Sequence, residues 1–111
     1  MSRDSRGYLE DILEATRKIV SYTAHLSKAA FLEDEKTFDA VVRNLEVIGE
    51  AVKKLPEDLR AHHPTVEWKK MAGLRAILIH EYFGLDSEIV WDIVKNKVPT
   101  LNQEVRAMLN P

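Results

Sequence analysis

The chain has 111 residues, of which 45% are hydrophobic and 31% charged, and its formal net charge is -2. This length and composition predict one folded, water-soluble domain that spans residues 1–111 and has a single core. The small negative charge excludes a polycationic surface for nonspecific duplex binding, and the lack of cysteine excludes disulfides, thiolate metal sites and thiol nucleophiles.

The sequence also argues against a membrane protein. No stretch approaches the roughly 20 consecutive apolar residues that a membrane-spanning helix needs. The amino-terminal stretch MSRDSRGYLEDILEATRKIV carries charges among its apolar positions, so it lacks the continuous apolar segment and cleavage site of a signal peptide. We therefore expect a cytoplasmic protein that has no membrane partner.

Two long amphipathic helices are predicted in the first half of the chain. Over residues 7–31, apolar side chains recur three or four residues apart, as they do on one face of a helix. Residues 34–55 repeat this pattern, with acidic residues early and lysines late, which is the order that the helix dipole favours. Pro56 is expected to stop or kink the second helix.

Shorter elements are predicted in the second half of the chain. Residues 56–65 suit a single helical turn that ends before Pro64. A third helix is predicted from about Val66 to Phe83, and Gly84 follows it as a typical helix terminator. Asp86 is a plausible N-cap for a fourth helix, after which Pro99 either starts a last short helix or kinks the fourth one.

The predicted fold class follows from these elements. No segment alternates apolar and polar residues for long enough to predict a strand, and the connections between the amphipathic segments are short. We therefore predict an all-α fold, an antiparallel four-helix up-and-down bundle with one or two short extra helices.

The stretch RAILIHEYFG places Arg75, His80 and Tyr82 in the third helix. Helical spacing places Arg75 and Tyr82 on the apolar stripe, whereas His80 lies about 140° around the helix from Arg75. A buried guanidinium must be paired, and either Glu46, Glu50 or a phosphate of a ligand can serve. The pattern alone leaves two interpretations open. These residues are either satisfied polar groups of a packed interior or a site that handles phosphate.

Other candidate residues have simpler interpretations. His62 and His63 diverge by about 100° in a helical turn and have no third ligand nearby, so we expect surface residues and no metal site. His25 is expected at the surface, and Trp68 and Trp91 are expected in the core or at an interface. No glycine-rich phosphate loop is present, and no cofactor is predicted.

The same stretch, in its setting, resembles a known family. The motif in RAILIHEY is an arginine, four residues, a histidine, one residue and a tyrosine; RNLEVIGEA lies upstream and VWDIVKNKVP downstream. In this order and spacing, these motifs resemble the HepT-like proteins of the HEPN superfamily, from about Tyr8 to Leu101. Such proteins are toxins, and their antitoxins are minimal nucleotidyltransferase (MNT) proteins.

The resemblance implies a function and a set of site residues. It implies a homodimer in which the Arg-and-His motifs of two subunits face each other across a cleft, and a metal-independent endoribonuclease. By position, Arg75 and His80 match the catalytic pair, and Tyr82 matches the tyrosine to which the antitoxin attaches AMP groups. Arg43 and Asn44 match residues that tend to line the same cleft.

The residue types fit this chemistry. Histidine titrates near neutral pH, so His80 is the candidate base or acid at the 2′-hydroxyl of RNA, and Arg75 can bind two phosphate oxygens at once. AMP on Tyr82 would occupy the charge and volume that the RNA phosphate requires. Ala76 departs from the family, whose members often carry a polar residue there. The alternative is therefore a weak or inactive homologue that binds nucleotide, RNA or its partner without cutting.

Overall fold

The computed structural model of the chain describes residues 1–74, 76 and 87–111. No strand occurs in these residues, which confirms the predicted all-α class. In chain order the helices are α1 (Arg3–Thr23), α2 (Lys28–Glu33), α3 (Glu35–Lys53), α4 (Glu57–Ala61), α5 (Trp68–Ala72), α7 (Ser87–Asp92), the π-helix η1 (Ile93–Lys97) and α8 (Val98–Leu109).

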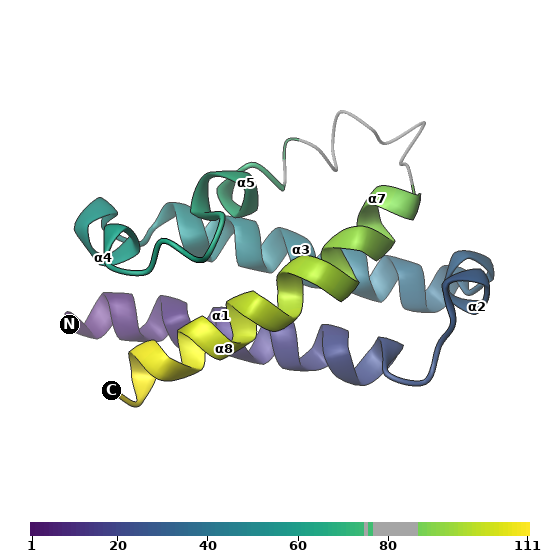
Figure 1. The fold of residues 1–111 in the computed structure, drawn as a ribbon, viewed down its shortest axis with the longest axis horizontal. Helices are drawn as coiled ribbons and strands as arrows, with labels where there is room; N and C mark the ends of the chain where they lie inside the picture. The colour runs from purple at the N-terminus through teal and green to yellow at the C-terminus, as the bar shows by residue number, and fades with distance from the viewer. Residues whose placement is uncertain (75, 77–86) are drawn as a thin grey trace.

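The architecture is an antiparallel arrangement of long helices (Figure 1). α1 and α3 run side by side in opposite directions, and the continuous helix formed by α7, η1 and α8 crosses them diagonally. α8 packs on α1, α5 packs on α3, and α2 contacts both α3 and α7. The chain therefore runs up and down as predicted. In the part of the chain that the structure describes, no helix is long and apolar enough to cross a membrane.

The prediction of one long helix over residues 7–31 is wrong in one respect, because this segment forms two helices. α1 ends at Thr23, whose hydroxyl donates to the carbonyl of Ile19 at 2.8 Å. Ser27 then caps α2, and its hydroxyl accepts a hydrogen bond from the backbone N–H of Ala30 at 3.1 Å. A serine hydroxyl that caps a new helix competes with continuation of the old one, and apolar spacing does not reveal this.

The start of α3 is also defined by a side-chain cap. Asp34 accepts a hydrogen bond from the backbone N–H of Thr37 at 3.0 Å and another from the Thr37 hydroxyl at 2.7 Å. The backbone bond and then the hydroxyl bond from Thr37 lower the pKa of the Asp34 carboxyl. The negative charge is favourable here because it lies at the amino end of the helix dipole.

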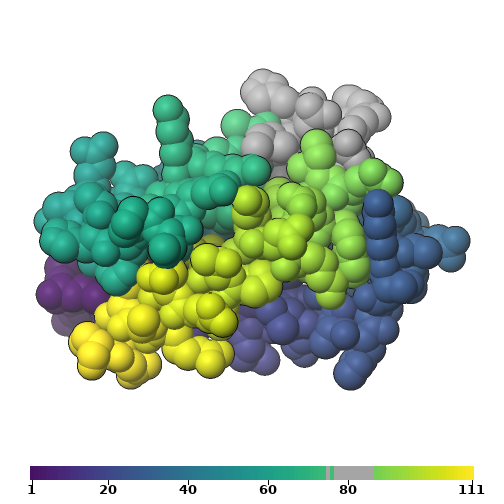
Figure 2. Space-filling view, viewed as in Figure 1, coloured from purple at the N-terminus to yellow at the C-terminus, as the bar shows by residue number. Residues whose placement is uncertain are grey.

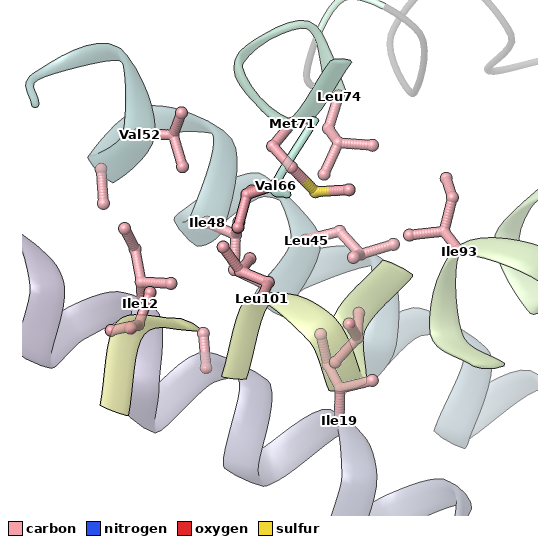
Figure 3. Packing of buried hydrophobic residues seen from close by; sticks show 14 of the residues in the cluster. Ile12, Ile19, Leu45, Ile48, Val52, Val66, Met71, Leu74, Ile93 and Leu101 are labelled. Carbon is pink, nitrogen blue, oxygen red and sulfur yellow. The ribbon is translucent and has the colours of Figure 1, made fainter. Parts of the chain in front are cut away.

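The core lies where the long helices meet α5 (Figure 3). Side chains from α1, α3, α5, η1 and α8 converge on one cluster, and Val66, which precedes α5, joins them. Burial of this apolar surface is the main favourable contribution to folding. The labelled members of the cluster are Ile12, Ile19, Leu45, Ile48, Val52, Val66, Met71, Leu74, Ile93 and Leu101.

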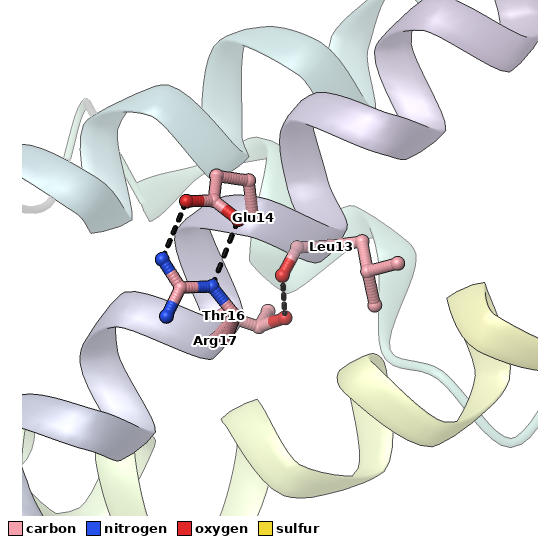
Figure 4. A network of polar contacts seen from close by, with 4 residues as sticks. All are labelled: Leu13, Glu14, Thr16 and Arg17. Atoms are coloured by element: carbon pink, nitrogen blue, oxygen red, sulfur yellow. Dashed lines mark hydrogen bonds and ion pairs between the residues drawn. The ribbon is translucent and has the colours of Figure 1, made fainter.

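One buried polar group on α1 is satisfied within the protein (Figure 4). The hydroxyl of Thr16 donates to the carbonyl of Leu13 at 2.8 Å. It also accepts a hydrogen bond from Nδ2 of Asn102 at 2.8 Å, which ties α8 to α1. Beside it, Arg17 Nη2 lies 2.6 Å from Glu14 Oε1. That second pair is exposed to solvent and contributes little to stability.

Pro99 lies in the first turn of the last helix, α8, which continues directly from the π-helix η1. The backbone N–H of Val98 donates to the carbonyl of Ile93, five residues back, which defines the π-turn of η1. In an α-helix the ring of Pro99 would clash with the carbonyl of Lys95, and the wider turn directly before it relieves that clash. On either side of this turn, α7 contacts α2 and α8 contacts α1.

The predicted third helix is described only at its beginning. It starts at Trp68 rather than Val66, and α5 extends to Ala72. Residues 75 and 77–86 lie outside the described part of the chain. The predicted helix end at Gly84 and the N-cap at Asp86 therefore stay predictions.

Candidate functional site

The three residues of the predicted site, Arg75, His80 and Tyr82, lie outside the described residues. The possible pairing of Arg75 with Glu46 or Glu50 therefore stays a prediction. The structure does define the two elements that flank them in the chain, α5 on the amino-terminal side and α7 with η1 on the carboxy-terminal side.

The amino-terminal flank is held by a buried tryptophan. Trp68 at the start of α5 is 7% exposed, and its indole N–H donates to the carbonyl of His63 at 2.9 Å. Met71 and Leu74 follow it into the core. The predicted core role of Trp68 is thus confirmed, and α5, which precedes Arg75 in the sequence, is anchored at its first residue.

The two neighbouring histidines behave differently. His62 is exposed as predicted, with Nδ1 2.6 Å from the carbonyl of Asp58. His63 was predicted at the surface, but it is half-buried, with Nδ1 3.2 Å from Oε2 of Glu104 on α8. The prediction fails for His63 because its partner lies 41 positions away in the sequence. Among the described residues, no three His, Asp or Glu side chains form a group that could hold a metal ion.

An ion pair joins the start of α5 to η1. Nζ of Lys97 lies 2.9 Å from Oε1 of Glu67, and Nζ of Lys70 lies 3.9 Å from Oε2 of the same carboxylate. The hydrogen bond from Lys97 is the largest influence that lowers the pKa of Glu67, and the same bond raises the pKa of Lys97. Both groups are therefore charged near neutral pH.

The carboxy-terminal flank is held by a similar combination of charge and aromatic packing. Nζ of Lys28 on α2 lies 3.1 Å from Oε1 of Glu88 on α7. The ring of Trp91 packs on Phe31 with centroids 5.1 Å apart, and Nζ of Lys95 lies 4.6 Å from the Trp91 centroid. Trp91 is thus an anchor of the core, as predicted, and it fixes α7 against α2.

The two predicted cleft residues of α3 have different surroundings. Arg43 is exposed, whereas the side-chain amide of the half-buried Asn44 donates to the carbonyl of Ala40 at 2.8 Å. Adjacent residues of a helix point about 100° apart, which explains the difference. Arg43 lines a groove of about 400 Å³ between α1 and α3, together with Tyr8, Asp11, Glu46, Val47, Glu50, Ala51 and Lys54.

Sequence reasoning missed the Glu67–Lys97 pair. Its two residues are 30 positions apart, so no helical spacing connects them. The only local signal was Lys70, which follows Glu67 at the spacing of one helical turn. The two residues come together only in the folded chain.

The described residues form an all-helical bundle, and the Arg-and-His motif lies in the sequence between α5 and α7. The chain belongs to the ribonuclease HepT-like family, whose model matches residues 12–108. That range includes every residue of the predicted site. The resemblance seen in the sequence is therefore confirmed.

Individual relatives cover almost the whole chain. The protein named "Putative RNase MJ0127" of Methanocaldococcus jannaschii is 51% identical over 96% of this chain and 88% of its own length. The "Probable ribonuclease HepT" of Thermococcus cleftensis is 46% identical over 91% of this chain and 92% of its own length. No solved structure matches the chain significantly.

Proposed function

We propose that this chain is the toxin of a toxin–antitoxin pair and acts as a metal-independent endoribonuclease in the cytoplasm. The observation that carries the proposal is the match of residues 12–108 to the ribonuclease HepT-like family. The names of the relatives, all of which refer to ribonucleases, support RNA as the substrate class. Arg75 and His80 lie within the matched range and have the residue types that RNA cleavage needs.

The proposed reaction uses the 2′-hydroxyl of RNA as the nucleophile. His80 accepts the hydroxyl proton, the 2′-oxygen bonds to phosphorus, and the bond from phosphorus to the 5′-oxygen breaks. The leaving oxygen takes a proton from the histidine of a second subunit or from water. Arg75 donates two hydrogen bonds to the phosphate oxygens as negative charge develops on them. The products are a 2′,3′-cyclic phosphate and a 5′-hydroxyl.

The proposal also includes a homodimer. The second copy would place its own Arg-and-His motif across the cleft, and Arg43 and Asn44 of α3 would line the RNA path. The exposed side chain of Arg43 supports this role, because a phosphate contact needs a cation that RNA can reach. The amide of Asn44 is already engaged with the carbonyl of Ala40, so its role requires a change of partner.

The proposed control of activity is adenylylation of Tyr82 by an MNT nucleotidyltransferase. The tyrosine oxygen attacks the α-phosphorus of ATP, pyrophosphate leaves, and the hydroxyl proton goes to a base. The resulting phosphodiester is negatively charged and lies seven residues from Arg75 in the sequence. It would compete with RNA phosphate for that guanidinium.

Tyr82 is the expected acceptor of AMP. Co-expression with the MNT partner is expected to raise the intact mass of the parent chain by whole adenylyl groups, and Tyr82→Phe should remove the increase, because phenylalanine has no nucleophilic oxygen. Tyr22→Phe is the matched control, since Tyr22 is 43% exposed on α1 and far from the motif in the sequence. An increase that persists in Tyr82→Phe would show that the acceptor lies elsewhere.

One observation favours a second candidate function. Ala76 directly follows Arg75, is exposed, and has no polar group with which to orient a neighbouring imidazole. A chain that lacks this group fits a module that binds nucleotide, RNA or its partner enzyme without cutting. The two candidates make opposite predictions in cells.

Expression of the gene alone separates the two functions. The proposed toxin is expected to stop growth and fragment cellular RNA, and both effects should disappear in Arg75→Ala and in His80→Ala. Arg17→Ala removes an exposed arginine of α1 and should leave the arrest unchanged. Normal growth and intact RNA with the unmodified parent chain would reject the ribonuclease and favour the binding module.

A further inference from the structure

One side of α3 carries charged side chains at regular helical spacing. On the face of the molecule shown in Figure 2, α5, α7 and α8 lie in front, and α3 lies behind them. Asp39, Arg43, Glu50 and Lys54 follow one another on α3 and its C-cap by four, seven and four positions. At about 100° per residue they lie within about 60° around the helix, opposite its core residues. We call these four residues the charged face of α3.

The charged face is open to solvent. Asp39, Arg43 and Lys54 are exposed, and the side chain of Glu50 is 43% exposed. Glu50 Oε1 lies 3.8 Å from Nζ of Lys53, and Nζ of Lys54 lies 5.6 Å from the ring centroid of Tyr8 on α1. A carboxylate has about four acceptor positions, so these contacts within one chain leave capacity for a contact with another.

The order of the charges is complementary to itself. Along α3 the signs run negative, positive, negative, positive, so an antiparallel second copy presents the opposite sign at each step. The register that places Arg43 opposite Glu50 of the second copy also places Asp39 opposite Lys54 of the second copy, because both pairs have their midpoint between residues 46 and 47. A two-fold axis at that midpoint repeats each pair. Complementary charge of this kind fixes the register of an interface more than its affinity.

The middle of this surface supplies apolar contact. Val47 lies beside the midpoint, is half-buried, and packs against the core. Together with Tyr8 and Ala51 it lines the groove of about 400 Å³ between α1 and α3, which three residues of the charged face also line. Burial of these side chains by a second copy would contribute the affinity. Glu46 is also near the midpoint, and Arg43 of the second copy lies about one helical turn away to balance its charge.

The same groove suits a protein surface better than nucleic acid. Three carboxylates, from Asp11, Glu46 and Glu50, outnumber the cations of Arg43 and Lys54 in its lining. An excess of negative charge repels a phosphate backbone. A guanidinium has five N–H donors, so Arg43 can pair with a carboxylate and still reach a phosphate at the rim.

We propose that the charged face of α3 is the two-fold contact of a homodimer. Two α3 helices pack antiparallel, Asp39 pairs with Lys54 of the second copy, and Arg43 pairs with Glu50 of the second copy. This inference rests on the homodimer of the proposed function and assigns the surface and the register that form it.

The test is a charge-reversal cycle on the dissociation constant, measured by sedimentation equilibrium at low ionic strength. Asp39→Lys and Lys54→Glu each place like charges opposite each other at two symmetric positions, so each is expected to raise the Kd of the dimer about tenfold. The double variant restores opposite charges and should return Kd to within about threefold of the parent value. The effect of each single reversal should shrink at high salt.

Mixing the two single variants gives a sharper result. In a mixed dimer of Asp39→Lys with Lys54→Glu, both symmetric positions again join opposite charges. The mixture should therefore form heterodimers with nearly the parent Kd, although each variant alone associates weakly. Arg106→Glu is the matched control, since Arg106 is exposed on α8, and its Kd should equal that of the parent. Melting temperatures within a few degrees of the parent value should show that every variant is folded.

The outcomes separate this inference from the ribonuclease proposal. A monomeric parent chain, a Kd that neither single reversal raises, or a mixture that associates no better than its components would each overturn the α3 contact. Cleavage of RNA by the parent chain is measured independently. If the parent cuts no RNA but the reversal pattern is found, the ribonuclease fails and the α3 contact stands; if it cuts RNA and the reversals have no effect, the reverse holds.

Discussion

Replacing His80 by alanine is expected to slow RNA cleavage by the purified protein about 10²- to 10⁴-fold. The imidazole supplies the base that removes the 2′-hydroxyl proton, and alanine leaves only water for that step. Arg75→Ala should lower the rate about 10²- to 10³-fold, the range for loss of one group that stabilises a developing oxyanion. Arg75→Lys should recover only part of this loss, because an ammonium group cannot donate in a bidentate fork.

The measurement is the initial rate on an end-labelled RNA in the presence of EDTA. The upstream product should carry a 2′,3′-cyclic phosphate. His25→Ala is the matched control, since His25 is exposed just after α1, and its rate should equal that of the parent. Parent-like cleavage by His80→Ala, or activity that disappears with EDTA, would reject the proposed reaction.

The helices that the sequence predicted well are those whose pattern is local. α3 matches the prediction for residues 34–55 closely, because apolar spacing, an acidic start and a following proline all agree. α4 falls between Pro56 and Pro64 as expected. Each of these signals acts over a few residues, so a single sequence is enough to reveal them.

The errors arose where a local competitor or a distant partner decides the structure. Apolar spacing continues across residues 24–27, but the Ser27 cap starts a new helix there. Pro99 indicated a break or a kink, and the π-turn that joins α7 to α8 has no sequence signature of its own. His63 is half-buried and contacts Glu104 of α8, and no pattern within one helix can predict that contact.

The predicted site shows the same difference between local signals and distant contacts. Motif spacing was sufficient to indicate the family, because the motif residues and their neighbours are contiguous in the chain. It did not distinguish the exposed Arg43 from Asn44, whose amide is bonded to its own helix. Nor did it indicate Glu67 and Lys97, which lie 30 positions apart in the sequence and meet only in the folded chain.

Phe31 of α2 packs against α7, the carboxy-terminal flank of the motif, and its replacement is expected to lower the free energy of unfolding strongly. It is fully buried, and its ring lies 5.7 Å from that of Phe38 on α3 and 5.1 Å from that of Trp91 on α7, measured between centroids. One side chain thus holds α2, α3 and α7 together. Both ring pairs are tilted, an arrangement that adds to the energy of apolar burial.

Phe31→Ala is expected to lower the free energy of unfolding by about 3–5 kcal/mol, because it removes a buried ring and leaves a cavity between three helices. That is a large part of the roughly 5–15 kcal/mol typical of a domain. Leu32→Ala on the same short helix should cost no more than about 0.5 kcal/mol, since Leu32 is 39% exposed. Urea denaturation followed by far-UV circular dichroism measures both. Similar losses in the two variants would show that α2 is held by its whole apolar surface. A loss confined to Phe31→Ala would instead show that α2 is held mainly by the buried Phe31 ring, which contacts Phe38 on α3 and Trp91 on α7.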